Sequence, residues 1–138
     1  MVILDTNVIS ELMRNNPHES VVARVRSYAV HDLYTTTITH AEILYGILLL
    51  PPGKRRGAVE AAAAAVFLEA FAGRILAFDA NAVQPYAEIA AARSRAGRPI
   101  SHFDAQIAAI ARTRNAPVLT GNDRDFAGCG IDVINPWK

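Results

Sequence analysis

The sequence predicts an α/β fold with three layers, in which a mostly parallel central sheet is covered by helices on both faces. Short apolar or β-branched segments alternate with longer helical segments, as expected where crossover helices join parallel strands. The first segment, residues 2–4, is wholly apolar, which is typical of a strand buried on both faces. Because 51% of the 138 residues are hydrophobic, we expect one folded domain over residues 1–138 and no disorder.

The first part of the chain contains two expected strands and two expected helices. Thr6 and Asn7, both good N-caps, follow the first strand and precede an amphipathic helix at residues 8–13. Beyond an Asn-Asn-Pro break, valines at helical spacing predict a helix at residues 18–28. The β-branched run at residues 33–37 predicts the second strand.

The second part of the chain continues this alternation. Pro51 ends a helix at residues 39–50, and the alanine-rich segment at residues 56–71 predicts another helix, which stops at Gly73. Residues 74–78 predict a strand. The last expected elements are helices at residues 80–96 and 101–115 and strands at residues 118–120 and 132–134.

Asp5 directly follows the first strand, ahead of the first helix. This order places its carboxylate at the carboxyl end of a central strand. Ligands of open α/β sheets bind at that edge. Asp5 is therefore the first candidate for an active-site residue.

Two further acids lie on apolar faces of the expected helices. Glu42 shares a helix face with Ile38 and Tyr45, and Asp104 shares one with Ile107. A carboxylate in apolar surroundings is costly unless it is hydrogen-bonded, paired or bound to a cation. Both acids are therefore candidates for a functional site.

A helix cap is the competing interpretation of these acids. The capping-box spacing occurs in Thr39-His40-Ala41-Glu42, Ser101-His102-Phe103-Asp104 and Thr120-Gly121-Asn122-Asp123. Taken singly, each acid fits a cap better than a catalytic group. The two interpretations are compatible, because helix N-termini that follow parallel strands lie at the same sheet edge as Asp5.

Carboxylates gathered at one sheet edge repel one another and need a cation. A set of ligands that are all oxygen favours a hard ion such as Mg²⁺ or Mn²⁺. The single cysteine, Cys129, excludes a site with several thiolates and an internal disulfide.

Five short motifs in a fixed order make the chain similar to a known family. The motifs are Leu4-Asp5-Thr6-Asn7, Ala41-Glu42, Phe103-Asp104-Ala105, Thr120-Gly121-Asn122-Asp123-Arg124-Asp125-Phe126 and Asn135-Pro136-Trp137. In order, spacing and length, the whole chain resembles the PIN-domain ribonucleases, in particular the VapC-type toxins of bacterial toxin–antitoxin pairs. The resemblance implies a PIN-like fold and endonucleolytic cleavage of RNA that depends on Mg²⁺ or Mn²⁺.

The resemblance also implies roles for four acids. Asp5 and Asp104 are expected to ligate the metal directly. Glu42 is expected to complete the metal's shell or to orient the attacking water. Asp123 is expected to ligate through a water or to hold a second ion.

The position of the fourth acid depends on how the last motif is counted. Counting forward from Thr120 places it on Asn122, and counting back from Phe126 places it on Asp123, with Asp125 as a third choice. We favour Asp123, because a carboxylate serves a cation better than an amide does.

Polar and basic residues near the acids complete the expected site. Short polar side chains suited to hydrogen-bond the carboxylates are Thr6, Asn7, Thr120 and Asn122. A net charge of +1 gives no overall attraction to nucleic acid, so contacts with RNA must be local. The arginines expected to contact RNA phosphates are Arg93, Arg98 and Arg124.

The resemblance implies two protein partners, a second copy of the chain in a homodimer and a small cognate antitoxin. No basic and then apolar leader precedes the first strand, and no apolar run approaches the roughly 20 residues that span a bilayer. We therefore expect a cytoplasmic protein that does not associate with membranes.

Three other functions are alternatives to the ribonuclease. A PIN-like module with an impaired active site, which only binds RNA or a partner protein, is the main alternative, and Asn122 favours it. A phosphatase of the haloacid-dehalogenase type needs a second aspartate two residues after Asp5, where the chain has Asn7. A receiver-like signalling domain needs a paired acid near Asp5 and a lysine at the expected place, and the chain lacks both.

Overall fold

Five short strands form one parallel sheet at the centre of the structure. The computed structural model describes residues 1–138, and the strands are β1 (Val2–Leu4), β2 (Leu33–Thr36), β3 (Ile75–Leu76), β4 (Val118–Leu119) and β5 (Val133–Ile134). Their order in the sheet is β3-β2-β1-β4-β5, and all four pairings are parallel. The predicted fold class and all five predicted strands are confirmed.

Helices connect the strands, and every helix that the sequence predicts is present. They are α1 (Thr6–Leu12), α2 (Glu19–Arg26), the short turn η1 (Val30–Asp32), α3 (Thr37–Leu48), α4 (Lys54–Ala64), the π-helical segment η2 (Ala65–Ala70), α5 (Ala80–Arg95), α6 (His102–Arg114) and α7 (Asp123–Phe126). The sequence pattern does not predict the short elements η1 and α7 or the change of α4 into a π-helix. None of the helices combines the length and the apolar character that a membrane span requires.

Helices α1 and α3 begin earlier than the sequence predicts, because a residue at the end of the preceding strand or directly after it caps each helix. Asp5 is the N-cap of α1, so Thr6 lies inside the helix. Thr36 is the N-cap of α3, so the helix begins at Thr37 and not at Thr39. Each helix therefore starts at the carboxyl edge of the sheet.

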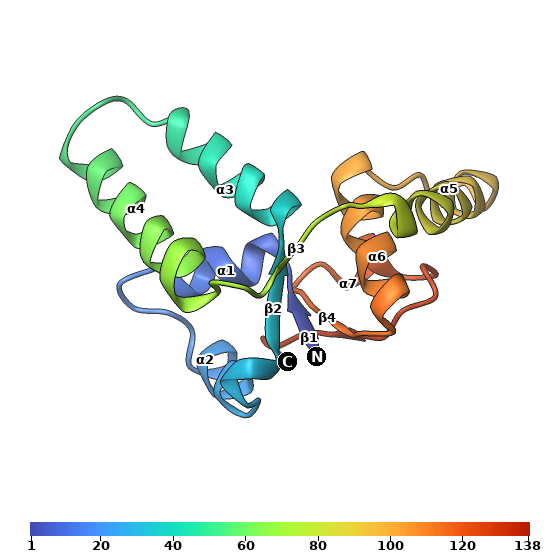
Figure 1. Cartoon of the computed structure of the whole chain (residues 1–138), viewed down its shortest axis with the longest axis horizontal. Helices are drawn as coiled ribbons and strands as arrows, with labels where there is room; N and C mark the ends of the chain where they lie inside the picture. Colours follow the sequence, from blue (N-terminus) through green and yellow to red (C-terminus); the bar gives the residue numbers. More distant parts are fainter.

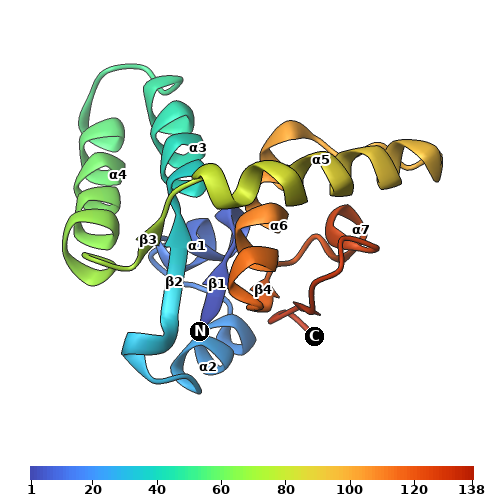
Figure 2. The same cartoon turned by 45° about the vertical axis from the view of Figure 1, so that its right-hand side comes forward.

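Two hydrophobic cores lie on opposite faces of the sheet. The alternation of side chains along β1 sends Val2 and Leu4 into one core and Ile3 into the other. Helices α1 to α4 cover the first core, and α5, α6 and α7 cover the second. In Figure 1, α3 and α4 form one arm of the molecule and α5 and α6 form the other, with the sheet between them. Figure 2 shows the same two arms after rotation.

Candidate active site

Asp5 lies at the carboxyl end of β1 and is 3% exposed. Its Oδ2 atom accepts hydrogen bonds from the Thr120 hydroxyl at 2.8 Å and from the Asn7 side-chain amide at 3.3 Å. The Asn7 amide also donates to Thr120 at 3.2 Å and accepts from the Gly121 N–H at 3.0 Å. Thr120 and Asn7 therefore make the expected hydrogen bonds, which join β1 to the segment after β4 and fix the orientation of Asp5. The Asp5 side chain makes no capping bond to its own helix.

Glu42 of α3 is held by a chain of two hydroxyl groups. The Thr6 hydroxyl donates to Oε1 of Glu42 at 2.8 Å and lies 3.1 Å from the hydroxyl of buried Thr39. Because the single proton of Thr6 goes to Glu42, Thr39 is the donor to Thr6. The predicted capping box at Thr39 is wrong, because the Thr36 side chain caps α3 by accepting the Thr39 N–H at 3.1 Å.

Asp104 lies in the first turn of α6. The predicted cap of this helix is confirmed, since the Ser101 hydroxyl oxygen accepts the Asp104 N–H at 3.1 Å. The Asp104 side chain also faces the cleft that Asp5 and Glu42 line. Here the capping interpretation and the site interpretation apply to the same residue.

An open cleft with a volume of about 560 Å³ brings these three acids together at the carboxyl edge of the sheet. Its lining is polar and includes Asp5, Thr6, Asn7, Ser10, Glu11, Arg14, Glu42, Asp104, Asn122 and Trp137. The lining therefore includes residues of α3 and α6, which belong to the two different arms in Figure 1.

Each of the three carboxylates is harder to ionise than usual. Burial raises the pKa of Asp5, although the hydrogen bond from Thr120 opposes the shift. Burial also raises the pKa of Glu42. Burial, together with the nearby charge of Asp5, raises the pKa of Asp104 to about 6. A cation in the cleft would offset both the desolvation and the repulsion.

The donor set of the cleft fits a hard divalent cation. No three histidine, cysteine or carboxylate side chains already lie close enough to enclose a metal ion. Mg²⁺ does not require such a cage, because it usually keeps several waters and binds one or two carboxylates with substrate phosphate. The cleft offers carboxylate, hydroxyl and amide oxygens and no thiolate or imidazole, which matches the preference of this ion.

The structure does not place Asp123 beside the other acids. Its carboxylate accepts hydrogen bonds from the Asn135 amide at 2.7 Å and from Nζ of Lys138 at 3.1 Å, and these bonds lower its pKa. Asn122 lines the cleft instead. Asp125 lies near enough for its charge to raise the pKa values of Asp5 and Asp104. The favoured fourth position, Asp123, is thus bound to the C-terminal segment.

Arg93, one of the arginines expected to contact RNA, is buried and hydrogen-bonded to backbone carbonyls. It is 7% exposed, its Nε donates to the Arg98 carbonyl at 2.7 Å, and its Nη1 donates to the carbonyls of Asp125 and Ala127 at 2.8 and 3.0 Å. Nη1 also lies 3.7 Å from Sγ of Cys129. The guanidinium is therefore occupied by backbone carbonyls from the segment after α5, from α7 and from the residue that follows α7. Of the arginines expected at the RNA, Arg98 and Arg124 are exposed and stay available.

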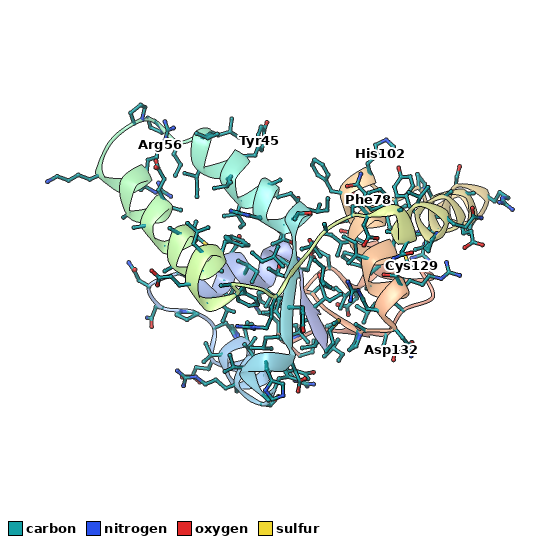
Figure 3. The ribbon with its side chains drawn as sticks, viewed as in Figure 1. Tyr45, Arg56, Phe78, His102, Cys129 and Asp132 are labelled. Atoms are coloured by element: carbon teal, nitrogen blue, oxygen red, sulfur yellow. The ribbon has the colours of Figure 1, made fainter.

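Figure 3 labels two side chains of the half of the molecule that contains α6, His102 and Cys129. Nδ1 of His102, at the start of α6, is 2.6 Å from the Tyr86 hydroxyl, and the Tyr86 ring also packs edge-on against Phe78. Cys129 is 2% exposed beside α6, as expected for a small buried residue, and burial raises the pKa of its thiol. Neither group lines the cleft.

Three residues that line the cleft lie outside the motifs, namely Ser10, Glu11 and Arg14. A signal for all three is present in the sequence. Asn7, Ser10, Glu11 and Arg14 follow the i, i+3, i+4, i+7 spacing of one polar helix face. Trp137 belongs to the last motif, but its place at the cleft depends on how the C-terminal segment folds back onto Gly121.

Replacing Gly121 with alanine is expected to displace Trp137 and to lower stability by about 1–2 kcal/mol. A Cβ atom at this position would lie 2.8 Å from the Trp137 ring, which is too close. Trp137 is the only tryptophan, so its fluorescence reports the displacement directly, and thermal unfolding followed by the same signal gives the stability change.

The matched control for this substitution is Gly57→Ala in α4, where nothing lies within 4 Å of the added atom. Alanine is the better helix former, so this variant should gain about 0.5–1 kcal/mol. Equal stability and equal fluorescence of the two variants would contradict the packing of Trp137 on Gly121.

Comparison with known proteins gives concordant results. The PIN domain family matches residues 2–130. The chain is 38% identical to "VapC ribonuclease Y4jK" of Sinorhizobium fredii over all of the chain and 99% of that protein. It is 32% identical to "tRNA(fMet)-specific endonuclease VapC" of Shigella flexneri over 98% of the chain and 96% of that protein. The crystal structure of FitAcB from Neisseria gonorrhoeae superposes with a TM-score of 0.91 at 39% identity, over 99% of both chains.

Proposed function

The chain belongs to the PIN domain family, and from that premise we propose that it is a metal-dependent endoribonuclease, the toxin of a type II toxin–antitoxin pair. One observation carries the proposal: Asp5, Glu42 and Asp104 line one open cleft, and all three have raised pKa values. The names of the relatives, ribonuclease, endonuclease and toxin, support it.

Asp5 and Asp104 are the residues that would hold Mg²⁺ or Mn²⁺ in this site, with Glu42 beside them. When bound, the ion would supply charge to stabilise the phosphodiester transition state and would acidify a water. Thr120 and Asn7 hold the Asp5 carboxylate in one orientation through its Oδ2 atom. Thr6 occupies Oε1 of Glu42, so Oε2 is left without a protein partner and can accept a proton from a water.

The place expected for a fourth acid lies in the segment that leads into α7. We assign this place to Asn122, which lines the cleft, and not to Asp123. The negative charge near the cleft comes from Asp125. Asn122 donates its backbone N–H to Thr120 at 3.0 Å, which ties this segment to the hydrogen bonds around Asp5.

A homodimer and a cognate antitoxin are part of the same proposal, with cytoplasmic RNA as substrate. The apolar residues of α3 divide between two environments. Ile43 and Ile47 are buried, whereas Leu44, Tyr45 and Leu48 are 43–67% exposed. Figure 3 shows Tyr45 on the outer part of α3. An exposed apolar row of this kind supports a protein interface on α3.

Cleavage of an RNA pool by the purified chain, free of antitoxin, tests the proposed function. We expect fragments in the presence of Mg²⁺ or Mn²⁺ and none after chelation. A folded protein that binds Mn²⁺ and RNA but cuts no RNA would contradict the proposal and would favour a PIN-like binding module.

Cleavage at limiting Mg²⁺ is expected to fall as the pH drops through about 6, the pKa of Asp104. A proton and the cation compete for this carboxylate, so metal affinity should fall about tenfold for each pH unit below the pKa. Initial rates between about pH 5 and 8 at two Mg²⁺ concentrations provide the measurement. A higher Mg²⁺ concentration should move the midpoint of the pH–rate curve to lower pH. A midpoint that does not change with the Mg²⁺ concentration would contradict this competition.

A further inference from the structure

The lining of the cleft includes one basic side chain, Arg14. The other charged residues that line the cleft are acids, including Asp5, Glu42 and Asp104. These acids repel an approaching RNA backbone, so the substrate needs a counter-charge beyond the reacting centre. Arg14 supplies a positive charge at the cleft, and its side chain is 68% exposed.

Glu11 fixes Arg14 at this position. Nη1 of Arg14 donates to both carboxylate oxygens of Glu11 at 3.3 and 3.4 Å. Oε2 of Glu11 also accepts the His18 backbone N–H at 2.9 Å, and this bond lowers the pKa of Glu11. The acid therefore stays ionised and is tied to the start of α2. Nε and Nη2 of Arg14 make no hydrogen bond within the protein, so they can donate to a ligand.

Arg14 also stands where the cleft meets a second groove. This groove, with a volume of about 810 Å³, lies between α1, α3 and α4 and shares Thr6, Ser10 and Glu42 with the cleft. Its lining contains a second exposed arginine, Arg55, at the start of α4. Two arginines along one groove suit an extended polyanion that continues out of the cleft.

We infer that Arg14 binds a backbone phosphate next to the scissile bond and directs the RNA from the cleft into the groove between α1, α3 and α4. The inference rests on the proposed ribonuclease function. Arg14 acts on substrate binding, since the free edge of its guanidinium presents two donors to phosphate oxygens. Glu11 is a positioning residue that holds this edge toward the cleft.

Binding of a short single-stranded RNA of mixed sequence to the Asp5→Asn protein tests the inference without cleavage. Adding Arg14→Ala should weaken binding by about tenfold at low salt and should reduce the salt slope by about 0.7, the value for one phosphate contact on a single strand. Arg14→Lys should keep the slope and recover part of the affinity, because it keeps the charge but not the planar fork.

Arg24→Ala is the matched control, since it removes one positive charge from an exposed position on α2 that lines neither the cleft nor the groove. In the cleaving protein, Arg14→Ala should raise KM with little change in kcat. An RNA affinity and salt slope that match those of Arg24→Ala would overturn the inference and leave the Glu11–Arg14 pair as a structural contact. Failure of the wild-type chain to cleave RNA would instead count against the proposed function, because the binding test needs no cleavage.

Discussion

Replacing Asp104 with asparagine is expected to lower RNA cleavage by about a hundredfold or more and, at the same time, to stabilise the metal-free protein. The loss of cleavage follows because the amide of asparagine carries no charge for the cation. The gain in stability follows because the pKa of Asp104 is raised to about 6 by burial and by the charge of Asp5. A raised acid pKa means that the folded state binds the proton more tightly than the unfolded state does.

The pH dependence gives the sign of this stability effect. At a pH below the pKa of the unfolded state, Asp104 does not lower the free energy of unfolding of the metal-free protein. Its destabilising effect grows as the pH rises and reaches its full size above about pH 6. At neutral pH the substitution should therefore add about 1 kcal/mol, a value reduced for solvent screening because Asp104 is only half-buried. Urea unfolding with a chelator present, at about pH 5 and about pH 7.5, measures the difference.

Glu88→Gln on α5 is the matched control, since Glu88 is exposed and lines no part of the cleft. It should change neither cleavage nor stability. An Asp104→Asn protein that is destabilised at neutral pH would show that the carboxylate supports the fold, which contradicts the account of the cleft.

Replacing Arg93 with alanine is expected to destabilise the protein by about 2–4 kcal/mol. The side chain donates to three backbone carbonyls, those of Arg98, Asp125 and Ala127, at 2.7–3.0 Å. Their removal leaves carbonyl groups without partners and opens a space beside Cys129. The loop that begins at Ala127 and α7 should loosen together, which thermal unfolding and hydrogen exchange of this segment can detect.

Arg95→Ala is the matched control on the same helix, because Arg95 is exposed and makes no side-chain hydrogen bond. Its stability should change by less than about 0.5 kcal/mol. Weaker RNA binding by Arg93→Ala with unchanged stability would restore the predicted role of Arg93 at the RNA.

The sequence was sufficient for those features that depend on local pattern. The apolar run of β1 and the short polar residues after it located Asp5 at the sheet edge. The apolar faces around Glu42 and Asp104 marked both acids as unusual, and the structure places both at the cleft. These inferences succeeded because hydrophobic periodicity and strand order determine which residues meet at one edge of a parallel sheet.

Other features depend on contacts between distant segments, and no local pattern reveals them. Arg93 belongs to a basic cluster in sequence, but backbone carbonyls of α7 and of the residue after it accept hydrogen bonds from its guanidinium. Asp123 lies in the motif of the fourth acid, but Asn135 and Lys138 bind it away from the cleft. Thr39 fits a cap by spacing, but the end of β2 places Thr36 in that position.

Binding of Mn²⁺, measured by the loss of its free electron paramagnetic resonance signal, tests most directly whether the acids of this cleft bind one cation together. Asp5→Asn and Asp104→Asn should each weaken binding by about tenfold or more, since each removes a charged ligand, whereas Asp123→Asn should bind like the wild type. Asp125→Asn should have a smaller effect, through charge alone. Equal Mn²⁺ affinity in all four variants would contradict the account and would place the metal outside the cleft.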